Sequence, residues 1–200
     1  MSDGAAVAAG SRPQIAVFGG SFDPPHLGHV YLAAYALSVE HVERVLVLPV
    51  FQHAFGKPLS PFAERVEMCR LAFRDLRRVE VSELERELGG VSRTLRLVET
   101  LAASHPHHAL RLLVGTDILA ESAHWQGFEE ITKRAPLLVA QRGGHLAKAA
   151  PYQGPVLPEI SSTDVRLALA RGEEPIDRVP SAVVHYAREH GLYGGGGAPP

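Results

Sequence analysis

The sequence predicts an α/β fold, in which helices cover both faces of a Rossmann-like, doubly wound parallel sheet and a small helical part follows at the C-terminus. Two observations carry this prediction: short apolar runs recur along the chain, and segments with helical spacing lie between them. A parallel sheet is buried on both faces, so its strands are continuously apolar, and crossover helices join them. The alternation therefore predicts successive βαβ units.

The expected strands are the short apolar runs. We expect one further short strand over residues 79–81. The four main runs cover residues 15–18, 45–49, 110–114 and 137–140.

The expected helices are the segments between the runs and two more near the C-terminus. In the second of them, large apolar residues recur every three or four positions along one stripe, as on the buried face of a helix. Gly172 and Gly191 are stop signals just past the last two helices. The expected helices cover residues 30–39, 62–73, 95–103, 128–133, 163–170 and 180–189.

The composition bounds the class of protein. The chain has 200 residues and a formal net charge of −2. A net charge this small provides no field for gathering nucleic acid or an anionic membrane, so we expect neither as a partner. Cys69 is the one cysteine, which excludes a disulfide framework and predicts a reducing, cytoplasmic location. The oligomeric state stays open, a homo-oligomer included.

The two ends of the chain differ from its middle. We expect residues 13–193 to form a single domain between flexible tails, residues 1–12 and 194–200. The first tail is small and polar and lacks the basic leader of a secretion signal, and the last is mostly glycine and proline. No apolar run reaches the roughly 18 residues that a bilayer-spanning helix needs.

The segment GGSFDPPHLGHV, residues 19–30, directly follows the first apolar run. Ligands of open α/β sheets bind at the carboxyl ends of the strands, so polar motifs just after a strand are candidates for the site. We expect the first strand to end at Phe18 and the two glycines after it to bend the backbone and admit a ligand. The two prolines stiffen the loop and place the start of the helix near Leu27 or Gly28.

His26 and His29 then occupy neighbouring positions in the first turn of that helix. Backbone N–H groups point outward at a helix N-terminus, beside the positive end of the helix dipole. Imidazole N–H donors next to them suit a phosphate group. A plain strand-to-helix turn would explain the glycines and prolines but not two histidines. A zinc site of the H-x-x-H type is a weaker alternative, because no third ligand is apparent.

A second candidate anion site lies near the C-terminus, in the segment ISSTDVR, residues 160–166. Its serines and threonine are residues that open helices. Arg166 follows in the first turn and adds a permanent cation, so hydroxyls, N–H groups and a guanidinium can together clamp a phosphate. An ordinary cap beside a surface arginine is the simpler alternative. Two such sites far apart in sequence suit one extended triphosphate.

Together the two motifs resemble those of the nucleotidyltransferase superfamily with the His-x-Gly-His signature, and most closely those of the nicotinate mononucleotide adenylyltransferases. The second signature of that family reads Ile-Ser-Ser-Thr-x-x-Arg. The resemblance runs from about residue 14 to the final HGLY at 190–193. It implies a Rossmann-like enzyme of NAD biosynthesis that transfers the adenylyl group of ATP to nicotinate mononucleotide, forming deamido-NAD and pyrophosphate.

The resemblance also implies roles for individual residues. His26, His29 and Arg166 would be catalytic, the histidines through contact with the ATP phosphates. The other residues that would bind ATP are Gly19, Gly20, Ser21, Phe22, Gly28, Gly115, Asp117, Ile160, Ser161, Ser162 and Thr163. Those that would bind the mononucleotide are Lys57, Thr94, Trp125 and Arg142.

Simpler roles stay open for some of these residues. Asp117 could cap a helix, and a lone tryptophan such as Trp125 is more often part of the packing than a ligand contact. Arg65 fits a family pattern, Arg-x-x-Met. At residues 92–94 the family commonly has Ser-Tyr-Thr, whereas this chain has Arg93 in place of the aromatic residue. That arginine could pair with a nicotinate carboxylate or face solvent.

The implied reaction needs no general base. A phosphate monoester has a second pKa near ~6 and is mostly dianionic at neutral pH, so the nucleophile is already charged. Catalysis would come from placement and charge, with Mg²⁺ bridging the phosphates. Asp23 could contact the ion indirectly, and a loop or capping role is the simpler alternative. Open alternatives are transfer to nicotinamide mononucleotide, phosphopantetheine or another phosphate monoester, a non-catalytic nucleotide-binding module, and a zinc hydrolase.

Overall fold

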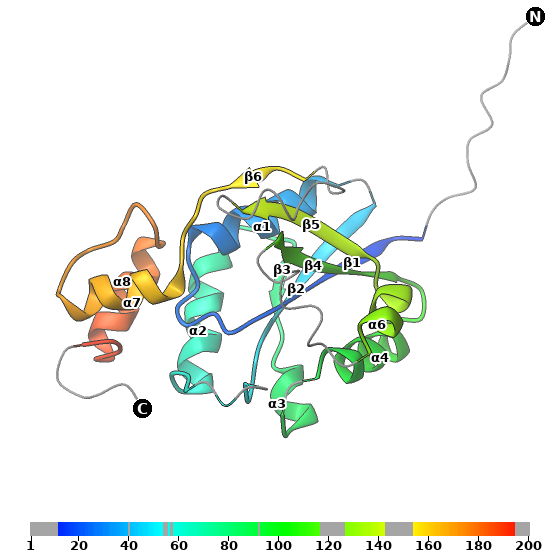
Figure 1. Cartoon of the computed structure of the whole chain (residues 1–200), viewed down its shortest axis with the longest axis horizontal. Helices are drawn as coiled ribbons and strands as arrows, with labels where there is room; N and C mark the ends of the chain where they lie inside the picture. The colour runs from blue at the N-terminus through cyan, green and yellow to red at the C-terminus, as the bar shows by residue number, and fades with distance from the viewer. Residues whose placement is uncertain are drawn as a thin grey trace, which may run out of the picture.

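The molecule is built on a parallel six-stranded sheet in the order β3-β2-β1-β4-β5-β6 (Figure 1). A computed structural model describes residues 12–39, 41–53, 56, 58–91, 93–116, 127–142 and 154–194. This strand order reverses at β1, as in doubly wound nucleotide-binding folds, which confirms the predicted fold class. The strands are β1 (Gln14–Gly20), β2 (Val42–Pro49), β3 (Val79–Val81), β4 (Ala109–Gly115), β5 (Leu137–Arg142) and β6 (Val156–Leu157).

The helices follow the predicted pattern closely. The predicted segment 62–73 is helical from its first residue to its last. The five-residue α3 and the two-residue β6 are not predicted, because they are too short to show a period. The helices are α1 (Leu27–Ser38), α2 (Phe62–Phe73), α3 (Leu84–Leu88), α4 (Thr94–Ser104), α6 (Phe128–Arg134), α7 (Ser162–Ala170) and α8 (Ser181–Glu189).

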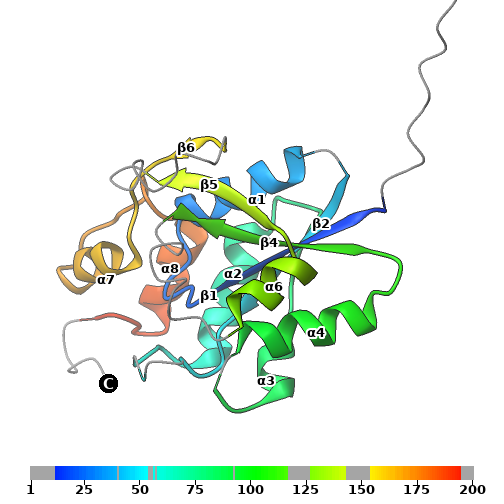
Figure 2. The same ribbon diagram turned by 45° about the vertical axis from the view of Figure 1, so that its right-hand side comes forward.

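Two apolar cores lie on opposite faces of the sheet, because successive side chains of a strand point to opposite sides. In β1, Ala16 and Phe18 belong to one core, and Ile15 and Val17 to the other. The first core is closed by α1, α2, α7 and α8, and the second by α3, α4 and α6 (Figure 2). The helices therefore cover both faces, as the sequence predicts.

The first strand extends two residues beyond the predicted end. Gly19 and Gly20 pair with Leu48 and Pro49 as part of the β1–β2 ladder, so they continue the strand and do not bend the chain. A side chain at Gly20 would approach the Phe22 ring to 3.1 Å, whereas one at Gly19 would meet open space. Gly20 thus makes room for a buried ring, and Gly19 leaves the strand end open to a ligand.

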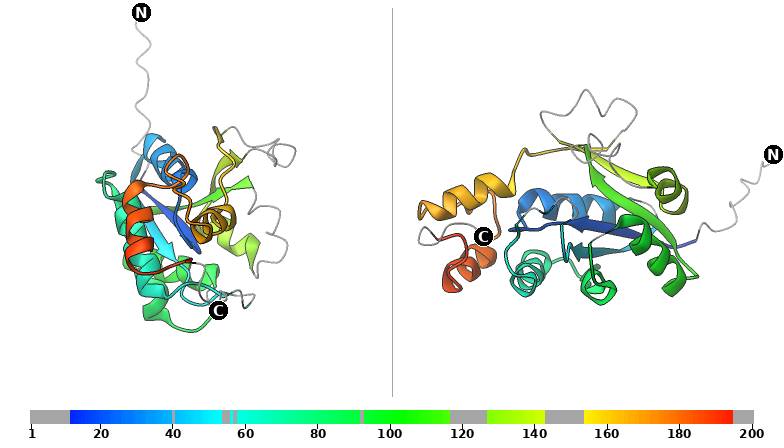
Figure 3. Two further views of the ribbon diagram at one scale, coloured as in Figure 1. Left: turned by 90° about the vertical axis from the view of Figure 1, so that its left-hand side faces the viewer. Right: turned by 60° about the horizontal axis from the view of Figure 1, so that its bottom comes forward.

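The carboxyl ends of the strands form the edge at which a ligand is expected. Helices α7 and α8 lie beyond this edge, on the side to which the strands point (Figures 1 and 3). The small C-terminal helical part therefore faces the turn that follows β1. None of the helices in the described ranges combines the length and apolar character that crossing a bilayer requires.

Cys69 lies in the core between α2 and the sheet and has no solvent exposure. Burial raises the pKa of its thiol, because the thiolate is poorly solvated there. Since only the thiolate reacts readily, we expect no modification by Ellman's reagent in the native protein at about pH 8. One thiol should react after unfolding in guanidinium. Rapid modification without denaturant would contradict the packing of α2 described above.

Candidate active site

Two histidines form the opening of α1. His26 is the N-cap residue and is 3% exposed, whereas His29 in the first turn is half-buried. Their rings stack with centroids 3.7 Å apart, and the backbone N–H of His26 donates to Nδ1 of His29 at 3.1 Å. Because Nδ1 accepts this bond, the neutral His29 ring carries its proton on Nε2. That nitrogen is therefore a hydrogen-bond donor.

Aromatic side chains hold the His29 ring in place. The centroid of its ring lies 5.9 Å from that of Phe18 and 4.9 Å from that of Phe22. Phe22 has a φ of +48°, which is unfavourable for a bulky residue, and its ring is buried to 1% exposure. Burial of the ring stabilises this backbone conformation, which turns the chain sharply after β1.

Gly28 provides space for the His26 ring. A Cβ atom at this position would lie 3.0 Å from Cε1 and Nδ1 of His26. The ring cannot retreat freely, since it also stacks on the ring of His29. Glycine in the His-x-Gly-His motif therefore sets the position of the first histidine.

The backbone donors at the start of α1 are fewer than expected. The N–H of Leu27 donates to the carbonyl of Arg178 at 2.9 Å, and the N–H of His29 donates to the carbonyl of His26. The expectation that the first-turn N–H groups point outward is therefore wrong at these two positions. These two N–H groups are therefore already engaged within the protein.

The second motif lies directly against the first. Ser161 caps α7 by accepting the N–H of Asp164, and Ser162 Oγ donates to the Pro24 carbonyl at 3.0 Å. Arg166 Nη1 donates to the Asp23 carbonyl at 2.6 Å. The openings of α1 and α7 are thus joined through two carbonyls of the turn after β1.

Arg166 is oriented from two sides. Besides its bond to the turn, it donates from Nη2 to Thr163 Oγ1 at 3.2 Å, on the same helix. A guanidinium has five N–H donors, so these bonds leave capacity for an anion. Ile160, which is 6% exposed, lies against the start of α1, since its Cβ is 3.9 Å from the position that a Cβ at Gly28 would take. The predicted residues of the two motifs therefore form one constellation.

A buried charge network supports the turn from below. Asp23 is 4% exposed, and its Oδ2 accepts the N–H of Ser60 at 3.0 Å while its Oδ1 accepts the hydroxyl of Tyr193 at 2.5 Å. Arg65 is 1% exposed and donates to the carbonyls of Ser60 and Ser21, both at 2.9 Å. Burial lowers the pKa of Arg65, and the charge of Asp23 opposes that shift.

The sequence pattern assigns Asp23 to the loop and does not single out Tyr193 at all. Residues 23 and 193 lie 170 positions apart, and no local pattern connects them. The only signal was the HGLY segment at the end of the resemblance, without any role attached.

The other predicted residues fall at the same edge or outside the described ranges. Gly115 ends β4, Thr94 is the first residue of α4, and Arg142 ends β5. No hydrogen bond in the described part of the chain joins Thr94 to the two helix openings. Lys57, Asp117 and Trp125, and the side chain of Arg142, lie outside the described residues.

Comparison with known proteins agrees with the geometry. Residues 17–168 match the cytidylyltransferase-like family model. A relative from Anaeromyxobacter sp. (strain K), named probable nicotinate-nucleotide adenylyltransferase, is 48% identical over 91% of this chain and 97% of its own length. One of the same name from Myxococcus xanthus is 42% identical, over 90% and 95%.

A solved structure shares the fold. The Plasmodium falciparum nicotinic acid mononucleotide adenylyltransferase, complexed with NaAD, superposes with a TM-score of 0.77 at 18% identity, over 90% of this chain and 97% of that one. The order of the strands, the two motifs and the extent of the matches all point to the same family. The chain belongs to the cytidylyltransferase-like family and, within it, to the nicotinate-nucleotide adenylyltransferases.

Proposed function

We propose that this chain transfers the adenylyl group of ATP to nicotinate mononucleotide, forming deamido-NAD and pyrophosphate in NAD biosynthesis. The observation that carries the proposal is the junction at Asp23 and Pro24, whose carbonyls hold Arg166 and Ser162 beside the stacked histidines. Polar and charged side chains from the starts of two helices therefore lie together at the carboxyl edge of the sheet. The relatives at 42% and 48% identity carry the name of that activity.

The residues divide the work between the reacting phosphorus and the leaving group. The mononucleotide phosphate attacks the α-phosphorus of ATP, and the bond to the β-phosphate oxygen breaks. His29 Nε2–H stabilises the charge that develops on the α-phosphate, which approaches the open end of β1 at Gly19. His26, Thr163 and Arg166 hold the departing pyrophosphate with their side chains. Ser162, whose hydroxyl donates to the Pro24 carbonyl, holds it with its backbone N–H at the start of α7. No proton has to be removed, because the attacking phosphate is mostly dianionic.

The rest of the ATP site follows the carboxyl edge. The backbone from β1 to α1 surrounds the α-phosphate through Gly20, Ser21, Phe22 and Gly28. Gly115, the last residue of β4, and Asp117 bind the adenosine. Ile160 and Ser161 complete the part of the site that binds the phosphates. The mononucleotide is bound by Lys57, Thr94, Trp125 and Arg142.

Nucleotidyl transfer from a triphosphate generally uses a divalent cation, and we propose Mg²⁺. The described residues contain no group of three His, Cys, Asp or Glu side chains that could hold a metal ion. Asp23, the carboxylate of the turn between β1 and α1, already accepts from Ser60 and Tyr193. The donor set therefore fits a cation that binds with the triphosphate and retains water ligands, as Mg²⁺ commonly does.

We also propose that residues 13–193 act as one domain in the cytoplasm, with small molecules as substrates. Neither nucleic acid nor a membrane takes part in this reaction.

The assay that tests the function compares two acceptors. Purified protein is given Mg²⁺ and ATP with either nicotinate or nicotinamide mononucleotide, and pyrophosphate release is followed. We expect turnover with the nicotinate form and a kcat/KM at least about tenfold lower with the nicotinamide form, about 1.4 kcal/mol of discrimination. Preference for the nicotinamide form would move the activity to that alternative acceptor. Turnover with neither would leave a nucleotide-binding module.

Replacing His29 by alanine tests the proposed donor. We expect His29→Ala to lower kcat by about 10²-fold or more, since it removes a hydrogen bond that strengthens in the transition state. The variant should still fold cooperatively, because His29 is only half-buried. His185→Ala on the exposed face of α8 is the matched control and should keep full activity. Near-normal turnover of His29→Ala would remove this residue from the mechanism.

Gly28→Ala tests the space beside His26. The added Cβ displaces the His26 ring, and a misplaced contact can cost about 10²-fold in rate, so we expect a kcat loss of roughly 10- to 100-fold. Alanine has the higher helix propensity, by about 0.5–1 kcal/mol, so thermal stability should change little.

The control for Gly28→Ala is the same substitution in a His26→Ala background. With the imidazole gone, the added methyl group has nothing to displace, and the second substitution should cost less than about twofold. An equal loss in both backgrounds would show that Gly28 acts through something other than the His26 ring.

A further inference from the structure

We propose that Tyr193 is a positioning residue for the residues that would hold the pyrophosphate. Its hydroxyl holds the Asp23 side chain, and the backbone carbonyl of the same Asp23 orients Arg166. The residues that would hold the pyrophosphate, called the pyrophosphate clamp below, are His26, Ser162, Thr163 and Arg166. The proposal rests on the proposed function, because the clamp is defined by the triphosphate that it would bind. It gives the C-terminal segment after α8 a part in the reaction.

The chain after α8 is shaped to bring Tyr193 back to the site. The N–H of Leu192 donates to the Ala187 carbonyl at 2.7 Å, and the N–H of Gly191 donates to the Arg188 carbonyl at 3.0 Å. These two bonds, with a φ of +62° at Gly191, form a Schellman motif. The motif reverses the chain, and Tyr193, the second residue after Gly191, donates to Asp23.

Asp23 depends on its partners because it is buried. A carboxylate with 4% exposure is stable only where hydrogen bonds and opposite charge replace its hydration. Tyr193 and the Ser60 N–H supply one bond to each oxygen, and Arg65 supplies the charge. Burial, and then the charge of Asp23, raises the pKa of the Tyr193 phenol, which therefore stays protonated and donating in neutral and mildly alkaline solution.

The side chain and carbonyl of Asp23 belong to one residue and move together. The side chain is fixed by Tyr193 and Ser60, and the carbonyl accepts from Arg166 at 2.6 Å. The next carbonyl, that of Pro24, accepts from Ser162 at 3.0 Å. A shift of Asp23 therefore shifts Arg166 and the start of α7, which hold the leaving pyrophosphate.

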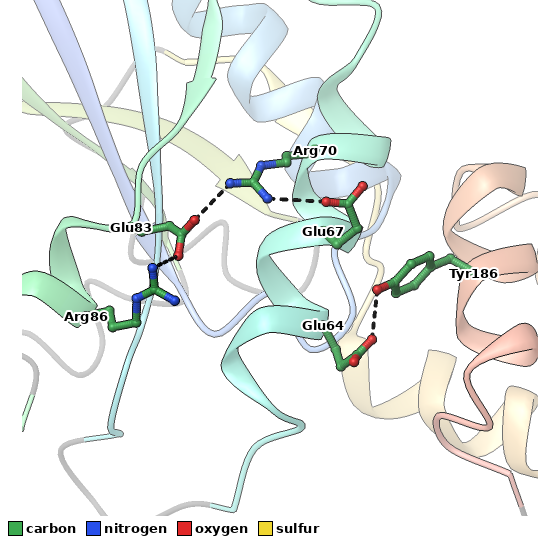
Figure 4. A network of polar contacts seen from close by, with 6 residues as sticks. All are labelled: Glu64, Glu67, Arg70, Glu83, Arg86 and Tyr186. Carbon is green, nitrogen blue, oxygen red and sulfur yellow. Dashed lines mark hydrogen bonds and ion pairs between the residues drawn. The ribbon is translucent and has the colours of Figure 1, made fainter.

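Tyr193→Phe removes only the hydroxyl and leaves the ring that packs against the core. We expect a roughly 10- to 100-fold loss of kcat/KM for ATP, the size that misplaced groups cause, and the same loss at every pH between about 6 and 9. Tyr186→Phe is the matched control: its hydroxyl also donates to a carboxylate, that of Glu64, at 2.8 Å between α8 and α2 (Figure 4). It should change kcat/KM by less than about twofold.

A double-mutant cycle separates positioning from a loss of stability. If Tyr193 acts through the clamp, Tyr193→Phe should cost less than about twofold in an Arg166→Ala background. Multiplication of the two losses, or a Tyr193→Phe variant as active as the parent, would overturn the proposal. If Tyr193→Phe does not fold, Asp23→Asn replaces it in the same cycle, since an amide has one accepting oxygen and cannot accept from both Tyr193 and the Ser60 N–H.

Calorimetry with a non-hydrolysable ATP analogue distinguishes this proposal from the proposed function. Binding of the analogue requires the clamp but no acceptor. Should the parent protein turn over neither mononucleotide, the proposed function fails, and the position of Tyr193 is still tested by this affinity. We expect Tyr193→Phe to weaken binding of the analogue about tenfold and Tyr186→Phe to leave it unchanged, and equal affinities in all three proteins would contradict the positioning role.

Discussion

Two backbone carbonyls, those of Asp23 and Pro24, are the constraint on which the site depends. Arg166 and Ser162 donate to them from a helix 138 and more residues further along the chain. A carbonyl in a tight turn has a fixed direction. Each of these hydrogen bonds therefore fixes where its donor atom lies. The parallel sheet brings the two helix openings to one edge, but these bonds align them with each other.

The turn can serve this purpose because it is rigid in itself. Proline at positions 24 and 25 restricts the backbone, and Phe22 is kept in its left-handed conformation by a ring buried to 1% exposure. Donors that are already in place lose little conformational entropy when the ligand arrives. Preorganised donors of this kind usually contribute more than any other single effect to stabilising a charged transition state.

Prediction from sequence succeeded where the information was local. Apolar runs and helical spacing give most elements of the fold, and the strand-end rule places the first motif at the carboxyl edge. It was wrong at the end of β1, where Gly19 and Gly20 remain in the ladder, because glycine favours turns but is not excluded from the end of a strand. It also missed the partner of the Leu27 N–H, the Arg178 carbonyl, and the Tyr193 bond, since contacts between distant segments leave no period or motif.

Asp23 poses an electrostatic problem that the structure solves. A carboxylate beside a triphosphate site repels the ligand, and the repulsion is stronger where the surroundings exclude water. Here each oxygen faces a donor, and the positive charge of the buried Arg65, which donates to the carbonyl of Ser60, offsets the charge of the carboxylate. The carboxylate thus faces partners inside the protein, while the carbonyl of the same residue holds Arg166 at the candidate phosphate site. In the proposed site, one residue therefore anchors Arg166 through its carbonyl while its carboxylate is compensated inside the protein.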